Sequence, residues 1–397
     1  MGRQGNKIQL TVIGAGPAGA YAAYTAAGKG LDVLLVERSP VIGHAPCCAE
    51  AISHIGLTSF VEPDMKFIAT PISAVQFTVA TGYICRRDFD NPIGYVLDRK
   101  EFDPYLAEMA VQAGAGLLPD TAVVDIKIDD SGPARLTLEG PQGNYEIESD
   151  FVIAADGVES MIGRQAGLNT QVKLSQSETT LQYRVKGIEV LPHCLEFCVG
   201  QKYAPGSYLW VFPKSENSAN IGLGLNPARH AGEELRPYLN RFLDKRYGRY
   251  EIEFETCGMV PKYLGLDIVG RDNLLLAGDA ARTLDSLVGA GIAKAMHTGR
   301  MAAESVAETI DKRFTTDQMQ KLYRQRIETE VGRDLSFTRK AYPVFRKFSD
   351  SDWETLVDFF AEYTKNKITG SISDPVNIVR SALRGAPQLL KLARHLF

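Results

Sequence analysis

The sequence predicts an α/β protein in which two separated segments build one parallel sheet, with an inserted antiparallel β-sheet and a C-terminal helical region. Three observations lead to this fold class. A strand, a glycine turn, a helix and a second strand follow one another within the first 36 residues, which is the βαβ pattern of a parallel sheet. From about residue 175 to 260 the apolar period changes to two, which is typical of antiparallel strands. Residues 315–397 show helical spacing, and we expect Pro343, Pro375 and Pro387 to break the helices.

Composition excludes several classes of protein. The chain has 397 residues, 45% hydrophobic, enough for two or three domains with real cores. Its 44 Lys and Arg against 48 Asp and Glu give a charge of −4, which argues against a nucleic-acid partner. Six cysteines are too few for a disulfide framework, and Cys194 and Cys198 are better explained as one face of a strand than as metal ligands. We therefore expect a cytoplasmic protein without a metal site, a secretory signal or a membrane-spanning helix.

Each element follows from its local pattern. Strands at Ile8–Ile13 and Leu31–Val36 flank a small-residue helix at Ala18–Gly28, the stretch from 42 to 94 is irregular, and a helix follows at Lys100–Ala115. The next strands are predicted at Val123–Ile128, Ala134–Leu138, Tyr145–Ile147 and Phe151–Ala155. The insert contains strands at Thr179–Val185, Leu195–Val199, Tyr208–Phe212, Ala219–Leu225 and Glu251–Met259. A buried strand at Asn273–Ala277 and a helix within Gly289–Ile310 return the chain to the parallel sheet.

The strongest motif is Gly14-Ala15-Gly16-Pro17-Ala18-Gly19, at the end of the first strand and the start of the first helix. The first glycine permits the tight turn, the second lets a pyrophosphate approach the backbone, and the third lets helix and strand pack closely. Glu37 ends the second strand, where its carboxylate can accept hydrogen bonds from ribose hydroxyls and would repel a 2′-phosphate. The pattern predicts a Rossmann-like site for FAD or NAD rather than NADP.

A second motif lies nearly 260 residues later. An apolar strand ends at Gly278-Asp279, which puts a carboxylate at the carboxyl edge of the sheet, and Gly289, Gly291 and Ile292 open a helix whose N–H groups can face a flavin ring. Together the two motifs predict an FAD that spans both ends of one discontinuous domain. We assign residues 1–70, 94–170 and 262–315 to this FAD-binding domain, 71–93 and 171–261 to the substrate-binding domain, and 316–397 to the helical region.

With these motifs the sequence resembles the geranylgeranyl reductase family, within the flavoproteins built like para-hydroxybenzoate hydroxylase. The resemblance rests on the two glycine motifs, Gly94 to Arg99, Ala154 to Gly157, and the segment Tyr208 to Gly224 (YLWVFPK…ANIGLG). It implies that the cofactor-binding residues also include Arg38, Arg99, Asp156 and Cys48. For Arg99 the alternative is a surface arginine at a helix start, and for Asp156 a plain strand-ending turn.

The family carries a cysteine beside the flavin, in a loop of the form Pro-Val-Arg-Cys-Gly-Glu. The corresponding stretch here is Ala45-Pro46-Cys47-Cys48-Ala49-Glu50, so Cys48 takes the place of the family cysteine and Cys47 that of its arginine. The resemblance makes Cys48 the catalytic candidate, because a thiol near the flavin can give a proton to one substrate carbon while the flavin gives hydride to its neighbour. The alternative is that both cysteines only fill a loop.

The resemblance implies an FAD-dependent reductase that saturates carbon–carbon double bonds of an isoprenoid (geranylgeranyl) chain on a lipid or quinone, in lipid biosynthesis. Tyr208, Trp210 and Phe212 share one strand face and either line a groove for this chain or form the core of the insert. The electron donor is NAD(P)H or a ferredoxin-like protein. Alternatives are a flavin monooxygenase of an aromatic or polyprenyl substrate, and a membrane-associated electron carrier to quinone. The cationic, leucine-rich tail after Asp374 suits peripheral contact with the inner face of a membrane, or packing within the protein.

Overall fold

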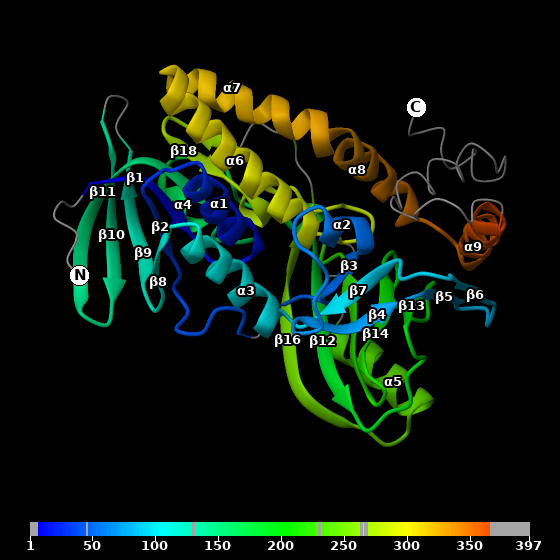
Figure 1. Cartoon of the computed structure of the whole chain (residues 1–397). Helices are drawn as coiled ribbons and strands as arrows, with labels where there is room; N and C mark the ends of the chain where they lie inside the picture. Colours follow the sequence, from blue (N-terminus) through cyan, green and yellow to red (C-terminus); the bar gives the residue numbers. More distant parts are fainter. Residues whose placement is uncertain are drawn as a thin grey trace.

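A computed structural model describes residues 7–44, 47–128, 132–228, 232, 234–262, 265 and 269–365. The described strands form three sheets, with helices packed on the first and a helical segment running from the first sheet to the second (Figure 1). The predicted fold class is confirmed, because a parallel sheet built from remote segments carries an antiparallel sheet between them. The division into domains by residue number remains our proposal.

The first sheet has the order β17-β18-β11-β1-β2-β8. Its strands are β1 (Lys7–Ile13), β2 (Val33–Val36), β8 (Gly116–Leu118), β9 (Ala122–Lys127), β10 (Ala134–Gly140), β11 (Gly143–Ala154), β17 (Gly270–Arg271) and β18 (Leu274–Leu276). Strands β18, β11, β1, β2 and β8 run parallel, and their inner positions, such as Leu10 and Val12 of β1, are completely buried. Strands β9 and β10 extend β11 as an antiparallel meander.

Three helices pack together beside this sheet: α1 (Pro17–Gly28) contacts both α3 (Arg99–Gln112) and α6 (Ile292–Lys312). The contact between α1 and α6 is close because small residues meet there. A Cβ atom on Gly299 of α6 would lie 2.0 Å from the carbonyl oxygen of Ala18. Asp98 is the N-cap of α3, and its carboxylate accepts a hydrogen bond from the Lys100 N–H. Aspartate is one of the residues that commonly cap a helix in this way. The short α4 (Met161–Gln165) follows β11.

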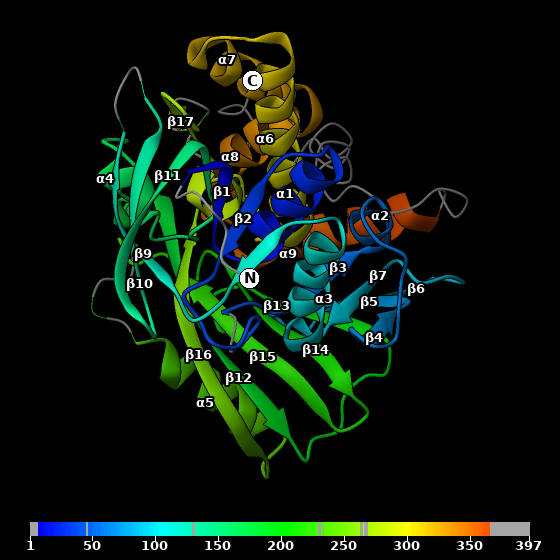
Figure 2. The same ribbon diagram turned by 60° about the vertical axis from the view of Figure 1, so that its left-hand side comes forward.

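The second sheet has the order β16-β12-β15-β14-β13-β5-β6 and lies below α1 and α6 in Figure 2. Its strands are β5 (Ala74–Val79), β6 (Ile84–Asp88), β12 (Ser177–Lys186), β13 (Cys194–Val199), β14 (Tyr208–Ser215), β15 (Ser218–Leu225) and β16 (Glu251–Pro261). All neighbours are antiparallel except β13 and β5. Leu209 and Val211 of β14 share one core with Leu239 and Leu243 of helix α5 (Leu235–Arg246), so α5 covers that face. The aromatic residues of β14 point to the opposite face.

A third, small sheet links the other two. It contains β3 (Ala51–Ser53), β7 (Gly94–Leu97) and β4 (Ile68–Ile72), and a short helix α2 (His54–Thr58) follows β3. The expectation of irregular structure from 42 to 94 is therefore wrong where β3, α2, β4, β5 and β6 lie. The strands in this stretch are short, and their partners are remote in the sequence. Strand β4 also contains Pro71, and β6 (Ile84–Asp88) contains charged residues. The local pattern therefore did not distinguish these strands from loops.

Two further expectations need correction. Tyr145–Ile147 and Phe151–Ala155 belong to one strand, β11, because its polar first half pairs with β10 and its buried second half pairs with β1. Helix α5 was not predicted, because it lies in the stretch from 175 to 260 where we expected only strands.

The C-terminal part that the structure describes is helical. Helix α7 (Thr316–Ile327) continues through a π-helical turn at Glu328–Gly332 into α8 (Arg333–Phe345), and α9 (Asp350–Lys365) follows (Figure 1). Pro343 lies inside α8 rather than at a break, which is a correction: the proline removes one backbone hydrogen bond, and the helix ends two residues after it. Pro375, Pro387 and the cationic tail lie outside the described residues. Within the described ranges, no helix has the length and apolar character needed to cross a bilayer.

Candidate functional site

The glycine motif forms a tight turn between β1 and α1. Gly14 has a φ of +96°, and a Cβ atom there would lie 2.4 Å from the carbonyl oxygen of Ala155. A Cβ atom on Gly19 would lie 1.8 Å from the carbonyl oxygen of Gly14. These two glycines are required by packing. At Gly16, in contrast, the nearest atom to a Cβ would be an Arg99 guanidinium nitrogen 4.0 Å away, so the space above this backbone is open on the side that a ligand would approach.

The first turn of α1 provides the electrostatics of an anion site. Gly16 is the N-cap, no side chain caps the helix, and the first turn carries no acidic residue, although Pro17, Ala18 and Gly19 are all buried. The positive end of the helix dipole and N–H groups that no side chain caps therefore meet near Gly16.

Glu37 lies at the end of β2, as predicted, and its carboxylate accepts hydrogen bonds from the backbone N–H of Ala15 (2.7 Å) and of Ser39 (2.8 Å). It thereby fixes the glycine loop, a contact that sequence reasoning did not foresee. Arg38 is 72% exposed, and its guanidinium is 3.9 Å from the Glu159 carboxylate. Contact of either side chain with an adenosine remains a prediction.

The second motif meets the first. Strand β18 leads into a 3-10 turn at Gly278–Ala281, where Gly278 has a φ of +63° and a Cβ atom on it would lie 2.9 Å from the Cβ of Ala18. The Gly278 N–H donates to the Thr298 hydroxyl of α6 (2.9 Å). Two segments about 260 residues apart thus converge at the start of α1, which is the arrangement that a dinucleotide-spanning site requires.

Asp279 presents a carboxylate that none of the described residues engages by a hydrogen bond in this structure. Burial raises its pKa, while the Arg99 and Arg282 guanidinium groups oppose that rise. A half-buried carboxylate without a hydrogen-bond donor is costly, and a hydroxyl of a bound ribityl chain would supply a donor. The residues present therefore fit the flavin nucleotide that the motifs predict.

The loop after Asp279 is held by Asp285, whose carboxylate accepts hydrogen bonds from the N–H groups of Leu287 (2.8 Å) and Val288 (3.0 Å). Gly289 has a φ of +68°. Helix α6 then begins at Ile292 with Gly291 as its N-cap and without a side-chain cap or an acid in its first turn. Contact of this N-terminus with a flavin ring remains a prediction.

Asp156 caps a helix. Its carboxylate accepts a hydrogen bond from the N–H of Ile162 in α4 (2.9 Å), and its second oxygen is buried without a partner among the described residues. Burial raises its pKa. The free oxygen leaves room for the predicted cofactor contact, which stays a prediction.

Arg99 is only 15% exposed, so it is not a surface arginine. Its guanidinium pairs with both carboxylate oxygens of Asp103 (2.9 and 2.5 Å) and lies beside Gly16 and the Cys48 thiol. Although burial opposes its charge, the Asp103 carboxylate raises the pKa of Arg99, which keeps it protonated.

The cysteine loop approaches the same place. Ala45 and Pro46 lie outside the described residues, Cys47 is exposed and Cys48 is half-buried. The Cys48 sulfur accepts a hydrogen bond from the Glu50 N–H (3.2 Å). Burial raises the pKa of the Cys48 thiol, and the Arg99 guanidinium opposes this rise only in part. Cys48 is thus a protonated thiol at neutral pH, the form that can donate a proton.

Cys47 occupies a space that a glycine leaves free. Its sulfur would lie 2.6 Å from a Cβ atom on Gly258 of β16, and it is 3.7 Å from the Thr180 hydroxyl of β12. The residue that replaces the family arginine therefore rests on the second sheet rather than pointing at the glycine loop.

Sequence reasoning missed a buried charge cluster behind Cys48. Glu50 is 3% exposed, and its carboxylate accepts hydrogen bonds from the side chains of Arg184 (2.7 Å), Lys214 (2.9 Å) and Asn220 (2.8 Å) and from the backbone N–H of Arg99 (3.0 Å). Although burial alone would raise it, these donors hold the pKa of Glu50 below its usual value. Alternation along β12, β14 and β15 could have put the three donors on one face, but nothing in the sequence pointed to their shared partner.

The three aromatic residues of β14 share one face, as predicted. Trp210 and Phe212 are 8% and 5% exposed and pack with Ile72 and Val96 of the small sheet, as core residues do. Tyr208 is half-buried, and its hydroxyl donates to the carbonyl oxygen of Val288 (2.7 Å), just before Gly289. The aromatic face therefore reaches the loop of the second motif through Tyr208, and its role in binding substrate remains a proposal.

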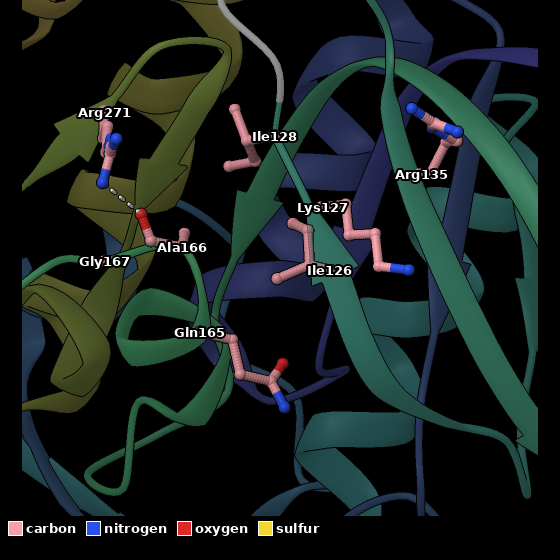
Figure 3. Close-up of a pocket in the computed structure, with 8 residues that line it drawn as sticks. All are labelled: Ile126, Lys127, Ile128, Arg135, Gln165, Ala166, Gly167 and Arg271. Atoms are coloured by element: carbon pink, nitrogen blue, oxygen red, sulfur yellow. Dashed lines mark hydrogen bonds between the residues drawn. The ribbon is translucent and has the colours of Figure 1, made fainter.

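A separate pocket of about 380 Å³ shares no residue with this site (Figure 3). It lies between β9, β10 and the end of α4, where the Arg271 guanidinium donates to the carbonyl oxygen of Ala166 (3.0 Å). Its other cations, Lys127 and Arg135, are exposed, and it contains no nucleophile or acid–base pair. The described residues also contain no cluster of three metal-ligating side chains.

Family models match two parts of the chain. One described as the geranylgeranyl reductase catalytic domain matches residues 176–259, which contain most of the second sheet. Another described as an NAD(P)-binding Rossmann-like domain matches residues 12–50, from the glycine motif to Glu50.

Curated relatives match over nearly the whole chain. A digeranylgeranylglycerophospholipid reductase from Methanothermobacter thermautotrophicus is 37% identical over 393 residues, 98% of this chain and 99% of that protein. A protein of the same name from Methanocella arvoryzae is 35% identical over 349 residues, 87% of this chain and 89% of that one.

Among solved structures, a geranylgeranyl bacteriochlorophyll reductase-like protein from Thermoplasma acidophilum superposes with a TM-score of 0.91 at 28% identity, covering 98% of this chain and 99% of that one. The p-nitrophenol 4-monooxygenase of Pseudomonas putida superposes with a TM-score of 0.71 at 16% identity, covering 96% and 98% of the two chains. The second likeness shows a shared fold only, since unrelated chemistries use one fold.

Proposed function

This chain belongs to the geranylgeranyl reductase family, and we propose that it uses FAD to saturate carbon–carbon double bonds of a geranylgeranyl chain on a glycerophospholipid. It is an oxidoreductase of the flavoprotein class, as the motifs of its sequence predicted. The observation that carries the proposal is the convergence of an anion cradle at Gly16, an unpaired carboxylate at Asp279 and a protonated thiol at Cys48 around the start of α1.

FAD, rather than a smaller flavin, is supported by the two ends of the site. Gly16 and the N-terminus of α1 would hold the pyrophosphate, with Glu37 toward the adenosine. Asp279 would accept a ribityl hydroxyl, and the N-terminus of α6 would lie toward the ring. When bound and reduced, the flavin supplies hydride to one carbon of the double bond.

The chain itself must supply the proton for the other carbon. Cys48 is the group best suited, because burial keeps its thiol protonated and the Arg99 guanidinium beside it stabilises the thiolate left after donation. Its proton would be replaced from solvent between turnovers.

The apolar substrate is supported by the face of β14. Tyr208 joins this face to the loop that opens α6, and Phe197 of β13 lies 5.5 Å from it, ring centre to ring centre. Half-buried aromatic residues beside a flavin loop suit an isoprenoid chain, which binds by burial of apolar area.

NAD(P)H or a ferredoxin-like protein is the proposed electron donor. We propose that the protein is cytoplasmic and binds peripherally to the inner face of the membrane, because its lipid substrate resides in a membrane.

The test is an anaerobic reaction of the dithionite-reduced holoprotein with vesicles that contain digeranylgeranylglycerophospholipid, followed by mass spectrometry of the lipid. We expect two hydrogen atoms to be gained per double bond reduced. Unchanged lipid with oxygen-dependent NAD(P)H consumption and a hydroxylated product would favour a monooxygenase. Unchanged lipid with electron transfer to a quinone would favour an electron carrier.

A further inference from the structure

We propose that Glu50 is a positioning residue, which fixes the loop that carries Cys48 so that the proton of the Cys48 thiol points toward the substrate. This inference rests on the proposed function, since it gives Cys48 the task of donating a proton. Glu50 is hydrogen-bonded to Arg99 and Cys48 of the predicted flavin site, but it is not itself one of the predicted cofactor contacts.

The backbone of Glu50 is held in an uncommon conformation. Its φ is +69°, in the left-handed region that residues other than glycine rarely adopt, and this conformation directs its N–H to the Cys48 sulfur (3.2 Å). The Glu50 carbonyl oxygen accepts a hydrogen bond from the Leu97 N–H (2.8 Å). Such a conformation persists only where the surroundings fix it, and here the side chain does so.

The carboxylate of Glu50 ties the loop to four elements. It accepts hydrogen bonds from the first residue of α3 and from one side chain each of β12, β14 and β15. The Lys214 ammonium, which is only 5% exposed, also donates to the carbonyl oxygen of Leu97. Movement of the loop would therefore break several charge-assisted bonds at once.

Charge makes Glu50 indispensable to the cluster. One carboxylate lies between two buried cations, Arg184 (13% exposed) and Lys214, so the cluster carries a net charge of +1. Burying such charges is costly, and hydrophobic residues would hold a loop as well. The free-energy cost of burying these charges is explained if the cluster holds the loop of Cys48 in a single conformation.

The other flank of Cys48 is held by the same sheet. The Cys48 carbonyl oxygen accepts a hydrogen bond from the Gln182 side chain (3.0 Å), and the Gln182 side-chain oxygen accepts one from the Trp210 indole (2.9 Å). Strand β14 thus contributes Lys214, which bonds to Glu50, and Trp210, which bonds to Gln182. The thiol and the aromatic face are fixed in one frame, which is what proton delivery to a bound chain needs.

The test compares Glu50→Gln in two backgrounds. The holoproteins are reduced with dithionite, mixed anaerobically with the lipid vesicles, and the rate of flavin reoxidation at saturating lipid is measured. With Cys48 present, we expect a slowing of roughly tenfold to hundredfold, the effect of a displaced reacting group, with unchanged flavin absorbance and unchanged half-saturation by lipid. In a Cys48→Ala background, Glu50→Gln should cause no further slowing, because a residue that acts through Cys48 cannot act without it.

The matched control is Glu253→Gln, the same substitution on an exposed glutamate of β16 that pairs with Lys186. It should leave the rate unchanged. Equal slowing by Glu50→Gln in both backgrounds, or none in either, would overturn the positioning role. If Glu50→Gln fails to fold because its cluster then holds a charge of +2, Glu50→Gln/Lys214→Met restores +1 and is measured instead with the same expectation.

A second readout does not depend on lipid reduction. We expect Cys48 in the Glu50→Gln holoprotein to be alkylated by iodoacetamide at pH 8 at least about fivefold faster than in the unaltered protein, because a released loop exposes the thiol. Peptide mass spectrometry distinguishes Cys48 from Cys47. If Glu50→Gln speeds alkylation but the unaltered protein reduces no lipid, the proposed function is wrong and the positioning role stands. If Glu50→Gln leaves the alkylation rate unchanged, only the positioning role is wrong.

Discussion

The sharpest prediction for the cofactor site is that Gly16→Ala separates cofactor binding from folding. Gly16 has φ −70° and ψ 179°, which alanine adopts readily, and no protein atom lies closer than 4.0 Å to the new methyl group. The apoprotein should therefore be about as stable as the original, because the lower entropy of the unfolded chain, worth about 0.4–1 kcal/mol, offsets the poorer N-cap that alanine makes.

FAD binding should respond in the opposite direction. The methyl group fills the space over the N-terminus of α1, where the pyrophosphate is proposed to lie. Loss of one hydrogen bond to a charged phosphate costs about 1.5–3 kcal/mol, which corresponds to a roughly 10- to 150-fold weaker affinity. The assay is titration of apoprotein with FAD, followed by quenching of flavin fluorescence, alongside thermal melting of the apoprotein.

A control for this prediction lies on the same helix. Gly28→Ala, at the exposed C-terminal end of α1, meets no atom within 4 Å and should leave FAD affinity unchanged. Gly19→Ala should instead prevent folding, since its Cβ would lie 1.8 Å from a carbonyl oxygen. An unaltered FAD affinity in Gly16→Ala would refute the placement of the pyrophosphate.

Three more predictions concern the carboxylates and the thiol. Cys48→Ala should bind FAD normally and reduce lipid about 10²- to 10⁴-fold more slowly, as expected for loss of a general acid, while Cys47→Ser should change the rate little. The rate is measured by flavin reoxidation. Full activity in Cys48→Ala would show that Cys48 has no catalytic role. The rate should fall at alkaline pH with a midpoint above the ordinary thiol pKa of about 8.5, because burial raises the pKa of Cys48 and only the protonated thiol donates; the same profile in Cys48→Ala would assign this limb to another group. Asp279→Asn should weaken FAD binding yet stabilise the apoprotein at pH 7, because burial raises the pKa of Asp279 and its ionised form therefore destabilises the fold at that pH. Denaturant titration of the apoprotein at pH 7 measures the change in stability. A destabilised apoprotein would contradict the prediction.

Most of the nucleotide site could be predicted because its signals are local. The motif requires particular residue types at fixed spacing: a glycine with positive φ, a helix start without a side-chain cap, and an acidic residue at a strand end. Gly14, Gly16 and Glu37 lie at the positions that this spacing predicts. The convergence of Gly278 on Ala18 also followed, because parallel strands end at one edge of a sheet.

The surroundings of Cys48 could not be predicted in this way. Glu50 collects donors from residues up to 170 positions away, and no local pattern encodes that pairing. The small sheet around β7 was missed for the same reason, because its strands are short and pair across long stretches of sequence. Trp210 shows a further limit: its face was predicted, but its burial depends on Ile72 and Val96 of another sheet.

Reoxidation of the reduced flavin by lipid, followed in a single anaerobic turnover, tests the central claim most directly. With a digeranylgeranyl phospholipid in the vesicles, the flavin absorbance should return at a rate that saturates with lipid, and the chain should gain two hydrogen atoms for each flavin oxidised. Vesicles of the fully saturated lipid should leave the flavin reduced. Equal reoxidation by both lipids, or by neither, would contradict the account.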